Sequence, residues 1–150
     1  MISSSRPPRI KVRNLQRKIP VDVVALQQVA AKGVRCCLRL KQRERTKLRR
    51  LHEIFVWLIS DYRMSRLHHQ FLGQEGATDV LTFQHGEIFI SVGTAKRNAR
   101  TFATSLVHEL ELYIVHGLLH LNGFDDRTSA DARTMKEVQE KILGECTGAG

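Results

Sequence analysis

The sequence predicts a single α+β domain, in which a small mixed sheet of about four strands packs with about five helices. The chain has 150 residues, of which 42% are hydrophobic, enough for one compact core but too few for two domains. Short segments with strand periodicity lie in the first two thirds, while helical periodicity dominates the last third. Together these observations favour one mixed domain over a bundle or a barrel.

The first fifty residues predict one strand, one helix and a charged connection. Apolar and basic residues alternate over 10–13, as in a short strand with one face inward. An apolar stripe over 21–34 predicts a packing helix, with Pro20 at or just before its first turn. Charge interrupts the apolar pattern over 39–50, so we expect a loop or an exposed edge there.

The middle of the chain predicts a strand, a helix and a hairpin. Residues 53–60 are rich in strand formers and end at Ser60, which can cap a helix running to about Phe71. After a glycine-containing connection, 79–83 and 87–91 have the composition of two strands joined by a short turn.

The last third is expected to be helical. Residues 95–121 supply helical material in which a break is favoured near Thr101, and a last helix is capped by Thr128 and runs to about Leu143, where Gly144 ends it. The sequence has no apolar run of 18 residues, and its first eight residues lack the apolar core of a signal peptide. We therefore expect a cytoplasmic protein.

The cysteines and the charges bound the function further. Three cysteines, Cys36, Cys37 and Cys146, have no metal-type spacing and are expected to be reduced thiols. The first 50 residues hold 15 Lys or Arg against two acids, whereas the other 100 hold nine against 13. This segregation suggests a surface for a polyanion such as RNA. The candidate RNA-binding residues are those of the densest basic run: Lys41, Arg43, Arg45, Lys47, Arg49 and Arg50. A solvated charged loop is the equally weighted alternative for this run.

The run from His116 to Asp126 has the pattern of a metal site. Its two histidines stand four residues apart, so His116 and His120 lie on one face of a helix. Gly123 can end that helix in a left-handed conformation, and Asp126 follows where the reversed chain returns to the histidine face. Two imidazoles and one carboxylate leave a tetrahedral ion with an open position, as in catalytic zinc sites.

The residues alone leave alternatives to this interpretation open. A histidine pair can simply be a surface pair or a satisfied core pair, and Asp125 competes with Asp126 as the third ligand. The natural reaction at such a site is hydrolysis by metal-bound water. In HExxH metalloproteases the residue after the first histidine is the glutamate base, whereas this chain has Gly117, which disfavours peptide hydrolysis. A phosphodiester substrate fits the basic N-terminal half better.

Two segments resemble one known family. The segment HGLLHLNGFDD, residues 116–126, closely resembles the signature HGxLHLxGyDH of the YbeY endoribonucleases, and TDVLTF with GEIFIS, residues 78–83 and 86–91, resembles their paired strands TDVLSF and GDIxIS. The resemblance implies an α+β endoribonuclease specific for single-stranded RNA, with one zinc ion per chain. It also implies a role in 16S rRNA 3′-end maturation and ribosome quality control, with ribosomal RNA and the small subunit as partners.

Carried over by position, His116 and His120 match the first two zinc ligands, and Asp126 stands where the family usually has a third histidine. Leu72 stands where the family motif LNxxYR has its arginine, so another cation must meet the phosphate; the nearby candidates are Arg63, Arg66 and His68. The catalytic residues themselves stay unassigned. The alternative function is a non-catalytic ribosome-associated RNA-binding factor with a structural metal, and a metalloprotease or small-molecule hydrolase is the weakest interpretation. Iron(II) also suits this ligand set.

Overall fold

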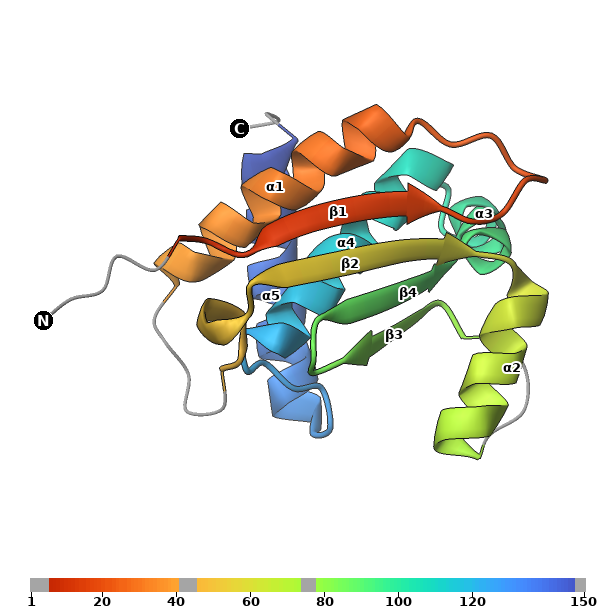
Figure 1. The fold of residues 1–150 in the computed structure, drawn as a ribbon. Coiled ribbons are helices and arrows are strands. Elements are labelled where there is room, and N and C mark those ends of the chain that lie inside the picture. The colour runs from red at the N-terminus through yellow and green to blue at the C-terminus, as the bar shows by residue number, and fades with distance from the viewer. Residues whose placement is uncertain (1–5, 41–45, 74–77, 148–150) are drawn as a thin grey trace, which may run out of the picture.

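The computed structural model describes residues 6–40, 46–73 and 78–147, and these form one α+β domain (Figure 1). The elements follow one another as β1 (Arg9–Asn14), α1 (Val23–Arg39), the short 3-10 helix η1 (Leu48–Arg50), β2 (Glu53–Ile59), α2 (Asp61–Leu72), β3 (Val80–Phe83), β4 (Glu87–Ser91), α3 (Val92–Thr101), α4 (Leu106–Leu121) and α5 (Ser129–Cys146). The four strands and five helices confirm the expected fold class. No helix in these described ranges is long and apolar enough to cross a lipid bilayer.

The sheet is mixed, with strand order β1-β2-β4-β3. Strands β1, β2 and β4 are parallel, and β3 pairs with β4 as the predicted antiparallel hairpin. Alternate residues turn their side chains into the core, and those fully buried include Val12, Ile54, Val56, Ile88 and Ile90. Figure 1 shows α1, α4 and α5 together behind the sheet, so one face of the sheet carries the main core.

Helix α4 lies close against β4 because a glycine faces the strand. A Cβ atom placed on Gly117 would lie 2.8 Å from both Cδ1 and Cγ2 of Ile88. Leu118, Leu119 and Leu121 are fully buried around it. Gly117 stands where HExxH metalloproteases have their glutamate, and here it is a packing residue. Its contact with Ile88 sets the distance between α4 and the sheet.

Three segments show how the helices compare with the sequence-based expectations. Helix α1 begins after Asp22, whose carboxylate accepts a hydrogen bond of 3.1 Å from the N–H of Ala25, so Pro20 lies before the cap. The charged connection holds η1, in which Leu48 is fully buried, so it is only partly an exposed loop. Residues 95–121 form two helices that separate after Thr101, as expected, although the first begins earlier.

The prediction that Gly144 ends the last helix is wrong, since α5 continues to Cys146. Ile142, Leu143 and Cys146 are all buried on the inner side of α5. Their packing outweighs the cost of a glycine inside a helix, which is about 1 kcal/mol. Glycine is a local helix-breaking signal, but Gly144 does not end α5 because Cys146, two residues later, is buried in the core.

The three cysteines are free, and all three are buried. Cys36 and Cys37 lie on α1 and Cys146 lies on α5, with 4.0 Å between the Sγ atoms of Cys36 and Cys146. Burial raises the pKa of all three thiols, that of Cys146 to about 12. They are core residues of the interface between α1 and α5.

Asp61, the first residue of α2, joins that helix to α3. Burial alone would raise the pKa of this carboxyl, but hydrogen bonds from Arg97, Ser91 and Thr94 outweigh burial and hold the pKa at about 2. Because the folded pKa lies below the ordinary value of 3.8, the ionised carboxylate stabilises the fold. This stabilisation is complete above that ordinary value and is lost as the pH falls towards 2.

Substituting Asp61→Asn is therefore expected to lower stability at neutral pH and to flatten the acid dependence between about pH 4 and pH 2. Denaturant unfolding at a series of pH values measures this. Asp22→Asn removes one negative charge but keeps a capping side chain, and serves as the control. An unchanged slope in Asp61→Asn would contradict the assignment.

Candidate metal centre

The end of α4 is built as a glycine-terminated helix that reverses the chain. Gly123 has a φ angle of 90°, its N–H donates to the carbonyl of His120, and the N–H of Phe124 donates to the carbonyl of Leu119. These two bonds form a Schellman motif, and the buried Phe124 side chain packs back onto the helix end. The reversal that the sequence predicted at Gly123 is present.

The reversal brings together three side chains that could hold a metal ion. His116, His120 and Asp126 each offer one ligand atom, and these atoms all lie within 4.8 Å of one another. The two Nε2 atoms are 3.1 Å apart, and Oδ2 of Asp126 lies 3.7 Å from Nε2 of His116 and 3.9 Å from that of His120. The group lies at the end of the core helix, as expected from the sequence.

Hydrogen bonds to the other ring nitrogens orient both imidazoles. Nδ1 of His116 lies 2.8 Å from Oε1 of Gln139 on α5, and Nδ1 of His120 lies 3.2 Å from the carbonyl of Phe124. Carbonyl and amide oxygens accept, so these two contacts favour the tautomer with the proton on Nδ1 and a lone pair on Nε2. Two such lone pairs at 3.1 Å repel unless a proton or a metal cation lies between them.

The donor set therefore fits a divalent metal ion. Zinc bound tetrahedrally at 2.0–2.1 Å places its nitrogen ligands roughly 3.3 Å apart, close to the observed separation. Burial lowers the pKa of His120 and the neighbouring His116 lowers it further, which favours the neutral, ligating imidazole. Asp126 supplies the negative charge that partly offsets both effects.

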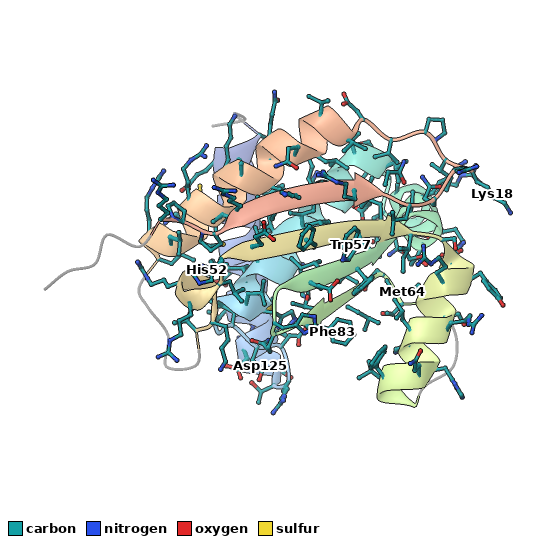
Figure 2. The ribbon with its side chains drawn as sticks, viewed as in Figure 1. Lys18, His52, Trp57, Met64, Phe83 and Asp125 are labelled. Carbon is teal, nitrogen blue, oxygen red and sulfur yellow. The ribbon has the colours of Figure 1, made fainter. Side chains whose placement is uncertain are left out.

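Asp125, the competing third ligand, points elsewhere. Its carboxylate accepts a hydrogen bond of 3.0 Å from the N–H of Arg127, and its Oδ2 lies 3.4 Å from Nε of the same residue. It lies in the loop after α4 (Figure 2). The geometry thus favours Asp126 over Asp125.

A cavity of about 410 Å³ has one of the three donors, His116, in its wall. Gln139, the hydrogen-bond partner of His116, also lines it. The other polar residues that line it are Asp79, Asn98, Thr104, His108, Glu109, Tyr113 and Lys136. Several are fixed by one another: Asn98 donates to the Tyr113 hydroxyl at 2.7 Å, and the buried Glu109 accepts from Thr104 at 2.8 Å.

Comparison with known proteins gives this centre its context. A family model described as endoribonuclease YbeY matches residues 11–147. The chain belongs to the YbeY family. It is 32% identical to endoribonuclease YbeY of Thermus thermophilus over 155 residues, which covers 95% of this chain and 96% of the relative. It is 29% identical to that of Chlamydia muridarum, covering 95% and 91%.

A solved structure has a similar fold. The solution structure of a Thermotoga maritima protein superposes with a TM-score of 0.65 at 27% identity, covering 93% of this chain and 90% of that one. Two other YbeY relatives are longer: the alignment spans 36% of the Myxococcus xanthus protein and 52% of the protein from Anaeromyxobacter sp. strain Fw109-5. The likeness therefore concerns the domain that all these proteins share.

The phosphate-binding candidates chosen from YbeY-like sequence spacing lie on α2. Arg63, Arg66, His68 and Leu72 do not line the cavity beside His116. Leu72 is 53% exposed, and the Arg66 guanidinium lies 5.8 Å from the Tyr62 ring centroid. Lys136 of α5 is the one lysine or arginine in the described wall of that cavity. The roles of the α2 residues stay predictions.

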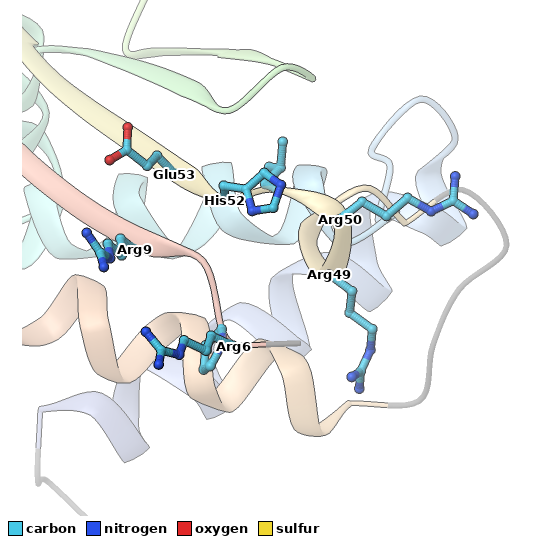
Figure 3. A pocket seen from close by; sticks show the side chains of 8 residues that line it. Arg6, Arg9, Arg49, Arg50, His52 and Glu53 are labelled. Atoms are coloured by element: carbon cyan, nitrogen blue, oxygen red, sulfur yellow. The ribbon is translucent and has the colours of Figure 1, made fainter. Parts of the chain in front are cut away.

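The basic run is described only in part. Lys41, Arg43 and Arg45 lie outside the described residues. Arg49 and Arg50, on η1, line a pocket of about 570 Å³ together with Arg6 and Arg9 at the start of β1 (Figure 3). The N–H of Lys47 donates to the carbonyl of Leu121 at 2.8 Å, which ties this segment to the end of the metal helix.

Sequence reasoning missed Gln139 and Lys136. Both come from α5, 13 and ten residues after Asp126, and nothing in their spacing marks them. Only the packing of α5 on α4 brings them to His116. Lys136 is exposed and Gln139 is half-buried, so the sequence pattern of α5 gives only a weak signal for either.

Proposed function

We propose that this chain, residues 1–150, is a single YbeY-type endoribonuclease domain that uses one zinc ion to cleave single-stranded RNA. The convergence of two imidazole Nε2 atoms and one carboxylate carries the proposal, since it offers three ligands to one ion, and a cavity lies beside His116. The names of the YbeY relatives supply the substrate class. By extension from the family, we propose 16S rRNA 3′-end maturation and ribosome quality control in the cytoplasm, with the small subunit as partner.

His116, His120 and Asp126 would hold the ion, which when bound acts as a Lewis acid and lowers the pKa of a coordinated water. Gln139 and the Phe124 carbonyl keep the two imidazoles in the ligating orientation. His116 lines the cavity, and we propose that a phosphodiester approaches the centre through it.

Lys136 is proposed to replace the arginine that this chain lacks at Leu72. Lys136 lines the cavity that also holds His116, from where its charge can neutralise the scissile phosphate. We expect Lys136→Ala to lower kcat/KM for RNA cleavage by about 10- to 100-fold, as for the loss of one charged contact in a transition state, with unchanged metal content.

Cleavage of a labelled single-stranded RNA by Lys136→Ala and by Lys141→Ala measures this effect. Lys141 is exposed on the same helix and outside the cavity, so its variant controls for the lost charge. Equal activity of the two variants would contradict the role of Lys136. A loss confined to Arg63→Ala or Arg66→Ala would assign the phosphate contact to α2 instead.

The proposal as a whole is tested by cleavage and metal analysis together. The purified chain should contain one zinc ion, cut single-stranded RNA, lose activity with a chelator and regain it when zinc is restored. Asp126→Ala should lower the metal content if that carboxylate is a ligand. Activity that persists without metal would overturn the proposed chemistry.

The second candidate is a non-catalytic ribosome-associated factor that binds RNA and keeps the metal for structure. The exposed Leu72, in place of an arginine, is the observation that favours it. This candidate predicts RNA binding that weakens steeply with salt, through Lys47, Arg49 and Arg50 together with the undescribed part of the basic run, and no cleavage with any divalent metal.

A further inference from the structure

One face of the sheet is left open by the helices that pack behind it (Figure 1). Among the described residues, α2 covers its carboxyl end, where Ile59 and Met64 are fully buried, and its Phe71 ring meets that of Phe83 edge to face at 5.4 Å. Strand alternation turns every second side chain toward this open face. These are Arg9, Lys11 and Arg13 from β1, Glu53, Phe55 and Trp57 from β2, Glu87 and Phe89 from β4, and Leu81 and Phe83 from β3.

Aromatic rings form a row across β2, β4 and the edge strand β3 on this face. Phe55 and Trp57 stack with centroids 5.0 Å apart and an angle of 6° between planes. Trp57 lies opposite Phe89 in the register, and Phe89 meets Phe83 edge to face at 5.7 Å. All four are only partly buried, and Figure 2 shows Trp57 and Phe83 on the sheet in front of the helices.

The indole ring of Trp57 is fixed by its one polar atom. Nε1–H donates to Oε2 of Glu87 at 2.6 Å, and Nε2 of His85 lies 2.6 Å from the other oxygen of that carboxylate. The ring therefore presents its apolar surface without an unsatisfied donor. A rigid, partly exposed aromatic surface of this kind binds flat ligands at a small cost in conformational entropy.

The edge of the same face is basic. Arg9, Lys11 and Arg13 project from the edge strand β1, and the row continues into the pocket that holds Arg6, Arg49 and Arg50 (Figure 3). The acids on the face are Glu53, 3.8 Å from Nζ of Lys11, and Glu87, which the Trp57 indole engages. The net charge of the residues along β1 and in this pocket is positive.

We propose that this open face binds single-stranded RNA, with bases on the aromatic row and phosphates along the basic edge of β1. The combination matches the ligand: unpaired bases stack on aromatic rings, while arginine and lysine follow the backbone. Paired bases in a duplex do not expose their faces to such a row. The inference rests on the RNA substrate of the proposed function, and it adds a binding surface away from the metal donors.

Trp57 is the one tryptophan of the chain and reports directly on this contact. Titrating the chelated wild-type protein with a short single-stranded RNA should quench its fluorescence saturably, whereas a duplex of the same length should not. Anisotropy of labelled RNA measures binding in parallel. Binding without quenching would overturn the inference. The chelator prevents metal-dependent cleavage during the titration, so binding is measured apart from catalysis. If RNA quenches the fluorescence but the metal-loaded protein does not cleave RNA, the proposed function fails while the RNA-binding surface remains supported.

Matched variants separate stacking from structure. Phe55→Leu should weaken RNA binding about tenfold, while Tyr62→Leu, which removes an exposed ring on α2, should not. Arg9→Ser with Arg13→Ser should lower the slope of log affinity against log salt by about 1.4. Arg35→Ser with Lys141→Ser, two exposed cations on helices, is the control. Circular dichroism confirms folding, and equal affinities and slopes across the folded variants would overturn the inference.

Discussion

Alanine in place of His116 or His120 is expected to release the metal ion and to reduce RNA cleavage by roughly a thousandfold, because a bound ion contributes several kcal/mol to such a reaction. Each imidazole presents Nε2 to the same point, and two remaining donors hold zinc weakly. The loss should appear in metal content and in kcat together.

Metal analysis and single-stranded RNA cleavage on the same preparation check this expectation. His69→Ala removes an exposed histidine of α2 and is the control for histidine loss and for contaminating nucleases. Full activity in His116→Ala, with metal retained, would show that the ion lies elsewhere. Loss of metal with full activity would separate the ion from the chemistry.

Valine in place of Gly117 is expected to destabilise the fold by about 3 kcal/mol or more. Even the Cβ atom would lie 2.8 Å from two carbons of Ile88, and the two γ-methyl groups of valine cannot both turn away from the strand. Gly117→Ala should be milder, about 1–2 kcal/mol, because alanine favours the helix but still collides with the strand.

Denaturant unfolding of Gly117→Ala, Ile88→Ala and the double variant measures the contact. Removing the Ile88 side chain makes room for the new methyl group, so the double variant should lose less stability than the two single losses combined. Strict additivity would show that the two residues do not collide.

The fold class, the hairpin and the metal helix could be predicted because their signals are local. The pattern from His116 to Asp126 predicts its own geometry. A spacing of four residues places both histidines on one helix face, and the positive φ at position 123 favours the glycine found there. Ser60 likewise marks the start of α2 through a hydrogen bond within one turn, accepted from the N–H of Arg63.

Features that depend on packing between distant segments were not predictable. The end of α5 is decided by contacts of Cys146 with α1, which outweigh Gly144. Gln139 reaches His116 across two helices, and the exposure of Trp57 depends on which face of the sheet the helices leave open. None of these relations has a fixed spacing along the chain.

The buried cysteines have a practical consequence for following the opening of the molecule. A thiol reacts with an alkylating reagent as its thiolate, and burial both raises the pKa of Cys37 and Cys146 and excludes the reagent. Labelling at neutral pH should therefore wait until α1 and α5 separate. Its rate then reports the frequency of that separation in the unmodified chain, and bound zinc or RNA that stabilises the closed state should slow it.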